Sequence, residues 1–394
     1  MKSGWQLKRL ADVAKVSAGN SAPQDESLFK DGVYPFFRTA DAGRVRFGEI
    51  HKSADYLNDK GIKGLRRYPS GTILFPKSGA STFLNHRVML GVEGFVSSHL
   101  ATIVADTTQI EPRFLLYFLS TVAAQDLIQD HAYPSLNLPT IEGISIQSPP
   151  LHEQKRIVDI LDEAFAVIAT AKANAEKNLQ NARALFKSHL NAVFSQRSEG
   201  WQTKTIDDVC EVVNGGTPKT GIADYWDGKH QWITPAEMGK RLTPYIGETA
   251  RSLTDLGLAN SSARLLPPFS VILSSRAPIG HLVINTKPMA TNQGCKGLVP
   301  SKAIEHKYLY YYLTSIVDLL NDLGTGATFK EISGGKLKEV KVPICPLPEQ
   351  HLIIKQLDTL SAETQRLESI YQQKLEALGE LKKSLLNQAF TGDL

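Results

Sequence analysis

The sequence has few cysteines and no long apolar run. Among its 394 residues there are three cysteines, and Cys210, Cys295 and Cys345 lie far apart, at none of the spacings typical of a zinc site. We therefore expect buried, reduced thiols in a reducing compartment. No apolar stretch approaches the roughly 18 residues of a membrane-spanning helix, and the opening residues lack the apolar segment of a signal peptide. These absences predict a cytoplasmic protein with no membrane partner.

The motifs of several enzyme classes are also missing. The sequence contains neither a G-x-x-x-x-G-K-[ST] phosphate loop nor a G-x-G-x-x-G dinucleotide fingerprint, and it has no Asp/Asn-Pro-Pro-Tyr/Phe tetrapeptide resembling an adenine methyltransferase. The histidines form no cluster typical of a metal site. The stretch from Ser333 to Lys336 matches S-x-x-K without its companion motifs, so we interpret it as a loop before a strand. We expect no catalytic residue, no metal and no cofactor.

What the sequence does contain is one phrase written twice. PPLHEQKRIVDIL covers 149–161 and CPLPEQHLIIKQL covers 345–357; Glu349 minus Glu153 is 196 positions. The same offset relates Gly4-Trp5-Gln6 to Gly200-Trp201-Gln202. Between the matching ends the two halves diverge. The repeat predicts two consecutive similar halves with individual middle sections.

Each half has the pattern of an irregular α/β domain followed by one long helix. Short runs such as GTILF and FSVIL alternate with Gly, Pro and Asn, which predicts strands joined by turns. Helical patches are expected over 111–128 and 305–323. A last strand is expected in each half from matching apolar positions: Ile141, Ile144 and Ile146 in the first, and Leu337, Val340 and Val342 in the second.

The two tails carry apolar residues at steps of three and four, as coiled-coil helices do. In the first tail these are Ile157, Leu161, Ala164, Ile168, Ala171, Ala175, Leu179, Ala182 and Phe186. In the second they are Ile353, Leu357, Leu360, Leu367, Tyr371, Leu375, Leu378 and Leu385. The prolines before them restrict where each helix can start. Because the first helix leads to the second domain and the second helix starts from it, we expect an antiparallel pair; the alternative is two separate surface helices.

Two similar but individually varied domains held apart by helices suit double-stranded DNA, since such a protein can contact two half-sites on one duplex. Polar and basic loops occur in both halves, including FFRTADAGRVRF and FPKSGASTFLNHR in the first and GGTPKT, SSRAPIGH and TNQGCKG in the second. Arginine pairs with guanine edges and Asn or Gln with adenine edges, while Lys, Ser and Thr hold phosphates. A net charge of +4 permits an anionic partner but does not prove one.

The sequence resembles the specificity subunits of Type I restriction-modification systems. The resemblance covers the whole chain and rests on the two helix-opening phrases, on SLLNQAFTGDL at the end, and on SSRAPIG, TNQGCKGL and GATFKEISGGKLKEVKVPICPLPEQ in the second half. It implies two α/β (α+β) target recognition domains separated by two long antiparallel coiled-coil helices, with an internal pseudo-two-fold repeat. The implied segments are a first recognition domain over 1–148, a spacer helix region over 149–198, a second recognition domain over 199–345 and a second spacer helix region over 346–394.

The resemblance also implies partners and a role. Each domain would read one half of a bipartite DNA site, and the helices would set the gap and dock two methyltransferase (modification) subunits, with ATP-dependent restriction subunits in a complete complex. The first half departs from the family wording, because SSHLATIVAD stands where the second half has TNQGCKGLVP, and YPSLN stands where it has GATFK. A different half-site would require such divergence.

These patterns give a set of candidate DNA contacts. In the first domain they are Arg38, Arg44, Lys77, Ser78, His86, Arg87, Ser98, His99, Ser135 and Asn137. In the second they are Thr217, Lys219, Arg276, Asn292, Gln293, Lys296, Thr328 and Lys330. Two alternatives remain open. Asn292 and Gln293 could hydrogen-bond their own loop, and the whole chain could be a noncatalytic adaptor whose two domains bind proteins; only a DNA reader should lose affinity steeply with salt.

Overall fold

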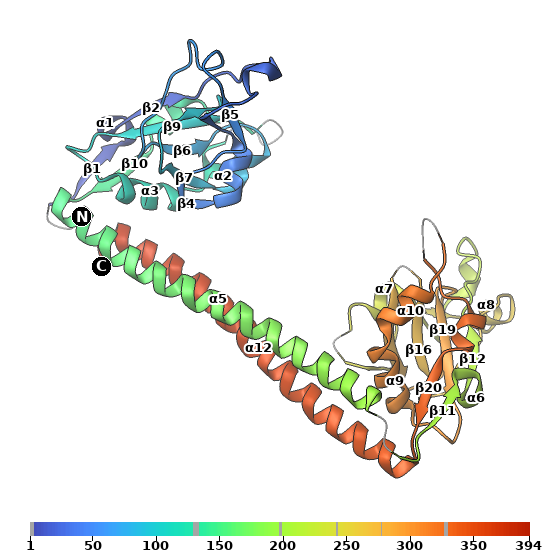
Figure 1. Cartoon of the computed structure of the whole chain (residues 1–394). Helices are drawn as coiled ribbons and strands as arrows, with labels where there is room; N and C mark the ends of the chain where they lie inside the picture. Colours follow the sequence, from blue (N-terminus) through green and yellow to red (C-terminus); the bar gives the residue numbers. More distant parts are fainter. Residues whose placement is uncertain (1–3, 129–133, 197–198, 242, 277, 327–329) are drawn as a thin grey trace. The chain divides into compact units, whose positions relative to one another are not determined.

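The computed structural model describes residues 4–128, 134–196, 199–241, 243–276, 278–326 and 330–394. The chain divides into two compact units, of which unit 1 comprises Met1–Ala175 and Lys374–Leu394 and unit 2 comprises Glu176–Gln373. Each unit contains one domain of mixed helices and strands together with a segment of each of two long helices (Figure 1).

Unit 1 is built on three small sheets. The main sheet has the spatial order β2 (Ala14–Ala18), β9 (Leu100–Ala105), β6 (Ile73–Pro76), β7 (Arg87–Leu90) and β4 (Phe47–Ile50). A second sheet has the order β5 (Asp55–Leu57), β3 (Tyr34–Phe37) and β8 (Phe95–Val96), and β1 (Gln6–Arg9) pairs with β10 (Ser145–Ser148). The central strand β6 is buried throughout, which explains why its sequence is a continuous apolar run rather than an alternating one.

Short helices cover the sheets of unit 1. They are α1 (Leu10–Val13), α2 (Thr39–Val45), α3 (Pro112–Thr121) and α4 (Leu138–Glu142), with 3-10 turns η1 (Glu26–Leu28), η2 (Ala80–Leu84) and η3 (Ala124–Leu127). The predicted helical patch over 111–128 is therefore α3 followed by η3. Helix α3 starts where the Glu111 carboxylate accepts a hydrogen bond from the Phe114 N–H, with Pro112 at its first position.

Unit 2 repeats this sheet arrangement strand for strand. Its main sheet has the order β12 (Cys210–Asn214), β19 (Cys295–Pro300), β16 (Val271–Ser275), β17 (Ile279–Asn285) and β14 (Tyr245–Ile246). Its second sheet has the order β15 (Arg251–Leu253), β13 (Trp226–Ile233) and β18 (Met289–Thr291), and β11 (Gln202–Thr205) pairs with β20 (Lys341–Ile344). The parallel pairs also correspond, since β4 with β7 and β3 with β8 match β14 with β17 and β13 with β18. The predicted internal repeat is confirmed.

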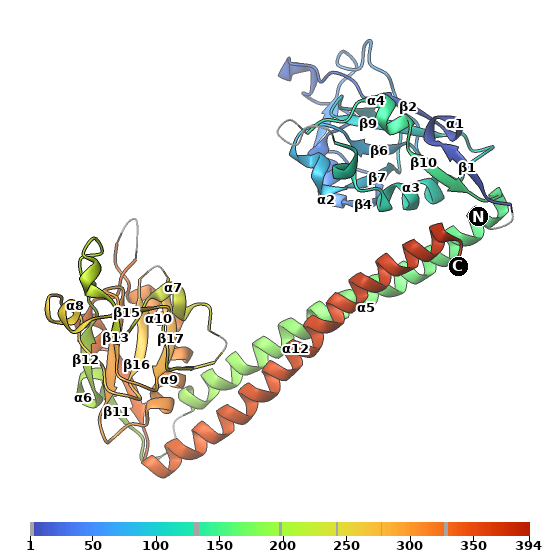
Figure 2. The same ribbon diagram turned by 180° about the vertical axis from the view of Figure 1, so that it is seen from behind.

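The helices of unit 2 are α6 (Ile206–Val209), α7 (Pro235–Met238), α8 (Asp255–Ala259), α9 (His306–Ser315), α10 (Val317–Leu323) and α11 (Gly334–Lys338), with a 3-10 turn η4 (Ala223–Tyr225). In Figure 2, α9 lies beside β16 and β17, as its contacts require. The patch predicted over 305–323 is divided between α9 and α10. Cys210, Cys295 and Cys345 are free and buried, as expected.

The expected last strand of each half is partly wrong. Ile141 lies in α4 and Leu337 lies in α11, so the strands β10 and β20 begin only at Ser145 and Lys341. Both short helices are capped, because the side chains of the preceding Asn137 and Ser333 accept hydrogen bonds from backbone N–H groups three residues on. Such a cap favours a helical turn over an extended strand.

The repeated phrase starts both long helices. Helix α5 (Leu151–Ser195) follows two prolines and α12 (Leu347–Thr391) follows Pro346, as predicted from proline at a helix start. In unit 1 the wholly buried Gln154 donates to the Pro149 carbonyl oxygen at 2.8 Å and accepts from the Glu111 N–H at 2.8 Å. This glutamine joins the start of α5 to the start of α3.

Gln350 makes the same contacts in unit 2. It is wholly buried, it donates to the carbonyl oxygen of Cys345 at 2.8 Å, and it accepts from the N–H of Glu305 at 2.9 Å. A buried amide needs all its partners in place, so the glutamine of each repeated phrase specifies how a long helix leaves its domain.

Within each unit the two helix segments run antiparallel. In unit 1, Arg156 donates to the Leu394 carbonyl oxygen at 2.8 Å, while the Lys382 ammonium lies 4.7 Å from the Phe165 ring. Residue numbers therefore rise along α5 in the direction in which they fall along α12. In unit 2, Arg183 pairs with Glu368 at 2.9 Å, and Leu190 and Phe194 near the end of α5 belong to one apolar cluster with Ile353 and Leu357 near the start of α12.

The apolar seam follows the predicted positions with one exchange. Ile157, Leu161, Ile168, Ala175 and Ala182 of α5 are buried. In α12, Leu367 is 37% exposed, whereas Thr364 is 3% exposed and donates its hydroxyl to the Leu360 carbonyl oxygen at 2.9 Å. A threonine whose hydroxyl is satisfied within its own helix can occupy an apolar seam.

Among the described residues, no helix combines the length and apolar character that crossing a membrane requires.

Candidate nucleic-acid interface

In unit 1, several loops meet where β6 ends and β9 begins. The Lys77 N–H donates to the His99 carbonyl oxygen at 3.0 Å, and the Leu136 N–H donates to the Lys77 carbonyl oxygen at 2.7 Å. The Gly19 N–H donates to the Leu100 carbonyl oxygen at 3.0 Å. Four chain segments that are far apart in sequence are thus held together at one end of the main sheet. The start of α5 is held near the opposite end of β9, because Gln154 contacts Glu111 beyond Ala105.

Unit 2 assembles the corresponding loops with the same backbone hydrogen bonds. The Ser275 N–H donates to the Gly294 carbonyl oxygen at 2.8 Å, the Ile332 N–H donates to the Ser275 carbonyl oxygen at 3.0 Å, and the Gly215 N–H donates to the Cys295 carbonyl oxygen at 3.2 Å. Backbone bridges join Ser78 to Ser135 in unit 1 and Arg276 to Glu331 in unit 2. The scaffold of this "loop end" is shared, whereas the side chains that it carries differ.

Five of the predicted contacts gather at the loop end of unit 1: Lys77, Ser78, Ser98, His99 and Ser135. The Ser78 hydroxyl lies 2.8 Å from His99 Nδ1, and the His99 ring is exposed. Lys77 and Ser98 are half-buried and Ser135 is exposed. The arrangement presents an ammonium, hydroxyls and an imidazole, which together can donate to phosphates and to base edges.

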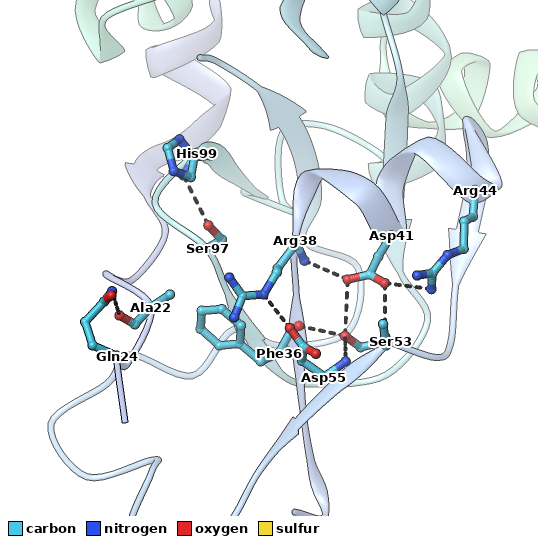
Figure 3. Close-up of polar contacts among 11 residues, drawn as sticks. Ala22, Gln24, Phe36, Arg38, Asp41, Arg44, Ser53, Asp55, Ser97 and His99 are labelled. Carbon is cyan, nitrogen blue, oxygen red and sulfur yellow. Dashed lines mark hydrogen bonds and ion pairs between the residues drawn. The ribbon is translucent and has the colours of Figure 1, made fainter. Parts of the chain in front are cut away.

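Figure 3 shows that Arg38 and Arg44 are held by carboxylates. The Arg38 side chain donates to Asp55, and its backbone N–H donates to Asp41 at 2.8 Å. Asp41 is 2% exposed and also accepts from Arg44 at 3.0 Å and from the Ala54 N–H at 3.0 Å. The side chains remain partly exposed, at 40% for Arg38 and 62% for Arg44. Their charges are therefore fixed in place and largely balanced.

The prediction for Arg87 is wrong. This residue is wholly buried, its guanidinium carbon lies 3.5 Å from the centre of the Phe75 ring, and it donates to the carbonyl oxygens of His86 at 2.9 Å and Val122 at 3.2 Å. Burial lowers the pKa of Arg87 to about 9. A side chain enclosed in this way cannot reach a nucleic acid.

Two further predicted residues of unit 1 have structural surroundings. His86 is half-buried, and burial together with Arg46 and Arg87 lowers its pKa. The Asn137 side chain accepts hydrogen bonds from the backbone N–H and hydroxyl of Thr140, at 2.8 and 2.7 Å, and so caps α4. Asn137 remains exposed next to the loop end.

In unit 2, two predicted cations share one carboxylate. Arg276 lies 3.8 Å from Glu331, and the Lys296 ammonium lies 3.7 Å from the same residue. The Lys296 side chain is only 8% exposed, whereas that of Arg276 is 36% exposed. Lys296 therefore holds Glu331 in position, and Arg276 keeps an accessible edge. Glu331 was not predicted, although it directly follows Lys330 in sequence.

Asn292 hydrogen-bonds its own loop through Gly294, as the alternative has it, and both Asn292 and Gln293 contact Thr217 of a neighbouring loop. Asn292 donates to the Thr217 hydroxyl at 2.9 Å and accepts from the Gly294 N–H at 2.8 Å, and Thr217 donates to the Gln293 side chain. Both amides keep further donors, because each carries two N–H groups. Lys219 and Lys330 are exposed. Thr328 lies outside the described residues.

Comparison with known proteins identifies the family. The sequence model of the Type I restriction modification DNA specificity domain matches the chain twice, over residues 2–180 and 198–377. The chain belongs to the Type I restriction-modification DNA specificity family. The two matches correspond to the two halves of the internal repeat.

Relatives in the family include the Type I restriction enzyme MjaIX specificity subunit of Methanocaldococcus jannaschii, which is 38% identical over 152 residues, covering 38% of this chain and 35% of that protein. The MjaVIII specificity subunit of the same organism is 22% identical over 99% of this chain and 93% of its own length. The EcoR124I/EcoR124II specificity subunit of Escherichia coli is 27% identical over 64% of each chain. The first alignment thus spans about a third of the relative.

Solved structures share the fold. A chain from a study of complex assembly and conformational transition of the type I R-M system has a TM-score of 0.82 and 20% identity, covering 100% of this chain and 99% of that one. The HsdS subunit from Thermoanaerobacter tengcongensis has a TM-score of 0.62 and 20% identity, covering 100% and 98%. The predicted fold class, two α/β domains with two long helices, is confirmed.

Proposed function

We propose that this specificity-family chain reads a bipartite sequence of double-stranded DNA, one half-site with each unit. The observation that supports this most directly is the repeated scaffold with unlike loop ends. Where unit 1 has Ser78 and His99, unit 2 has Arg276 and Gly294 on the same backbone hydrogen bonds. Different donor and acceptor groups on one scaffold would read different base edges.

The proposed contacts are the exposed or half-exposed members of the predicted set. For the first half-site they are Lys77, Ser78, Ser98, His99, Ser135 and Asn137, with Arg38, Arg44 and His86 beside them. For the second they are Lys219, Arg276, Gln293 and Lys330, with Thr217, Asn292 and Lys296 positioning their neighbours, and Thr328 stays a prediction. Lysines and hydroxyls would hold phosphates, while Arg276 and Gln293 carry the geometry for guanine and adenine.

The long helices would dock two methyltransferase (modification) subunits, one on each unit. Each unit exposes large apolar side chains on its helix segments: Leu381 is 47% exposed in unit 1, and Leu185 is 53% exposed in unit 2. These two residues are 196 positions apart, the same offset that relates the repeated phrases. Equivalent apolar positions on the two helices favour two equivalent partners. ATP-dependent restriction subunits would join this complex in the cytoplasm, where its DNA lies.

Docking can be tested by charge substitution at those positions. We expect Leu381→Glu and Leu185→Glu each to lower the number of bound modification subunits from two to one, and the double variant to lower it to none, as counted by native mass spectrometry. Gln180→Glu, an exposed polar position on a different face of α5, is the matched control and should leave two. A double variant that still binds two subunits contradicts this docking surface.

The helices would also set the unread gap between half-sites. Each is continuous over 45 residues, which is about 68 Å at about 1.5 Å per residue. Inserting four residues after Ala175 and after Tyr371 would lengthen both helices by about one turn, roughly 6 Å, and we expect the unread spacer to grow by one or two base pairs while both half-sequences stay the same. An active double insertion that retains the original spacer contradicts the ruler.

DNA reading is tested by methylome sequencing of cells that express the chain with its modification subunit. The expected outcome is one methylated bipartite sequence with a constant unread gap. In vitro, the affinity of the complex for that sequence should fall steeply with salt because phosphate contacts release counterions. A wild-type complex that methylates no bipartite site, with salt-independent binding, would favour the protein-binding adaptor.

A further inference from the structure

Unit 2 contains a pair of tryptophans that are fixed to its loop end. Trp226 and Trp232 are 8% and 2% exposed, and their rings meet edge to face with centroids 5.1 Å apart. The Trp232 indole N–H donates to the Gly216 carbonyl oxygen at 2.9 Å, and the Trp226 indole N–H donates to the Lys219 carbonyl oxygen at 3.3 Å. The rings therefore form a rigid platform attached to the loop that carries Thr217 and Lys219.

A guanidinium lies on this platform. The Arg251 guanidinium carbon is 3.6 Å from the centre of the Trp226 ring, a stacking distance, and 5.3 Å from that of Trp232. Arg251 is the β15 residue paired with Trp232 in β13, and the residue is exposed. The adjacent strands β13 and β15 can be followed in Figure 2. Among the described residues, no carboxylate forms an ion pair with Arg251.

Unit 1 has a pair of phenylalanines, Phe29 and Phe36, whose rings meet edge to face, and it supplies the guanidinium from a different position. Phe36 occupies the register position of Trp232, because Phe36 pairs with Asp55 as Trp232 pairs with Arg251. The Arg38 guanidinium lies 5.3 Å from the Phe36 ring and 5.6 Å from the Phe29 ring, and it donates to Asp55. Figure 3 shows this Arg38–Asp55 pair beside Phe36. The position that holds Arg251 in unit 2 thus holds the neutralising carboxylate in unit 1.

The difference leaves one guanidinium with an unused fork. An arginine stacked on an aromatic face loses little further freedom when it binds, and its planar N–H groups match a pair of acceptor atoms. In unit 1 the carboxylate of Asp55 takes part of that fork. In unit 2 the equivalent charge is uncompensated and lies next to the loop of Thr217 and Lys219, so an acceptor pair from outside the chain is the missing partner.

We propose that Arg251 is a DNA-contacting residue of unit 2, whose stacked guanidinium binds an acceptor pair on the second half-site. The inference rests on the proposed function and adds a residue that the basic loops did not point to. Two groups on DNA offer this acceptor pair: the O6/N7 edge of guanine and the two free oxygens of a phosphate. The experiment distinguishes them.

The test uses the full chain in complex with its modification subunit. Methylation of a library with a randomised second half-site, and binding at several salt concentrations, are measured for wild type, Arg251→Ala and Arg251→Lys. Lys302→Ala, which removes an exposed charge just beyond Pro300 at the opposite end of β19, is the matched control. The preference at the first half-site, which Arg251 does not serve, is the internal control for folding of each variant.

For a guanine contact, Arg251→Ala should lower affinity for the preferred sequence by about 5- to 150-fold and relax one base position of the second half-site, and lysine should not restore that preference. For a phosphate contact, Arg251→Ala should weaken all sequences alike and reduce the salt slope by about one, and lysine should largely restore binding. Either outcome supports the proposal.

Unchanged affinity, base preference and salt slope in Arg251→Ala would overturn it and leave Arg251 as a packing residue. If alanine disturbs folding, so that the first half-site preference is also lost, Arg251→Gln decides, because glutamine keeps an apolar stem beside Trp226 and removes the charge. A glutamine variant with a relaxed base position or with a salt slope lowered by about one supports the proposal. A glutamine variant with wild-type base preference, affinity and salt slope overturns it. A wild-type complex that methylates no bipartite site contradicts the proposed function itself, so the two failures are distinguishable.

Discussion

The two units are most alike where each domain meets the long helices and least alike at the loop end. In unit 1, Tyr117 donates to Asp162 of α5, which also pairs with Arg113 at 3.0 Å. In unit 2, Tyr311 donates to Asp358 of α12 at 2.5 Å, with Lys307 pairing at 2.7 Å. The same tyrosine, carboxylate and cation fasten each domain to its helix. The geometry of attachment is kept, whereas the surface proposed to read DNA is free to change.

The attachment is nevertheless not identical in the two units. In unit 1, Phe165 of α5 packs on Tyr117 at 5.4 Å between ring centroids, and Phe47 packs on the same ring at 5.5 Å. The α12 position 196 residues beyond Phe165 is Ser361, which lines a cleft of about 500 Å³ beside Tyr311. A serine cannot fill the space of a phenylalanine ring, so unit 2 has a hollow where unit 1 is packed.

The largest expected effect comes from changing Arg87, a core residue in which the two units differ. Arg87 is buried in unit 1, and its register counterpart in unit 2 is Leu282, since Leu74 pairs with Val88 as Ile272 pairs with Val283. We expect Arg87→Ala to lower the free energy of unfolding of unit 1 by on the order of 3 kcal/mol, because it leaves a cavity and removes two buried hydrogen bonds. Arg87→Leu should cost clearly less.

Hydrogen exchange in peptides of β6 and β7 measures the change in the free energy of unfolding of unit 1. The peptides of the corresponding strands of unit 2, β16 and β17, are the control. The Arg87 Nε atom has no hydrogen-bond partner among the described residues, so an apolar replacement removes an unsatisfied donor as well as a charge. Leucine and alanine variants of equal stability would show that the shape of the Arg87 side chain contributes nothing.

The attachment predicts equal effects in the two units. Tyr117→Phe and Tyr311→Phe each remove a hydroxyl that donates to a partly buried carboxylate, and we expect each to lower the free energy of unfolding of its own unit by about 1 to 2 kcal/mol. Urea unfolding combined with hydrogen exchange in α3 and α9 assigns the loss to a unit. If only one of the two variants lowered the free energy of unfolding of its unit, the repeated hydrogen bond would not stabilise the two units equally.

Removing the carboxylate at the aromatic platform of unit 1 should make that unit more like unit 2. Asp55→Asn frees the Arg38 fork, and we expect affinity for DNA carrying the first half-site to rise by about two- to fivefold at low salt, with a smaller gain at high salt because the pair is partly exposed and screened. Asp31→Asn removes an exposed charge before β3 and is the matched control. If both variants gained the same affinity for DNA, the change in net charge alone would explain the effect.

The smallest expected difference is a response to acid. Burial lowers the pKa of His306 in unit 2, and the residue at the equivalent first position of α3 in unit 1 is Pro112. A histidine with a lowered folded pKa binds fewer protons folded than unfolded, so it makes unit 2 less stable as pH falls below the ordinary histidine pKa of about 6.5. Thermal unfolding of unit 2 between pH 7 and 5 should be flatter in His306→Leu than in wild type; parallel curves would contradict this.

The sequence alone determined the features that repeat or that follow a short period. The offset of 196 predicted two similar halves, the prolines before each tail predicted where α5 and α12 begin, and the steps of three and four predicted most of the helix seam. These signals are local or self-referential: a proline restricts its own backbone and a seam residue needs only its neighbours one and two turns away. The family followed from phrases of the same kind.

Only the tertiary structure decided which partner each polar side chain has. The sequence predicted Arg87 as a cation in a loop, whereas the structure buries it in the core. Glu331 was not among the predicted residues, and it pairs with both Arg276 and Lys296. Arg251 belongs to none of the basic loop segments, and it stacks on Trp226. Each outcome depends on residues tens of positions away that the sheet brings into register. The residues next to a charged side chain in sequence do not show whether that side chain is buried or paired. Burial and pairing are set by strand register and loop closure.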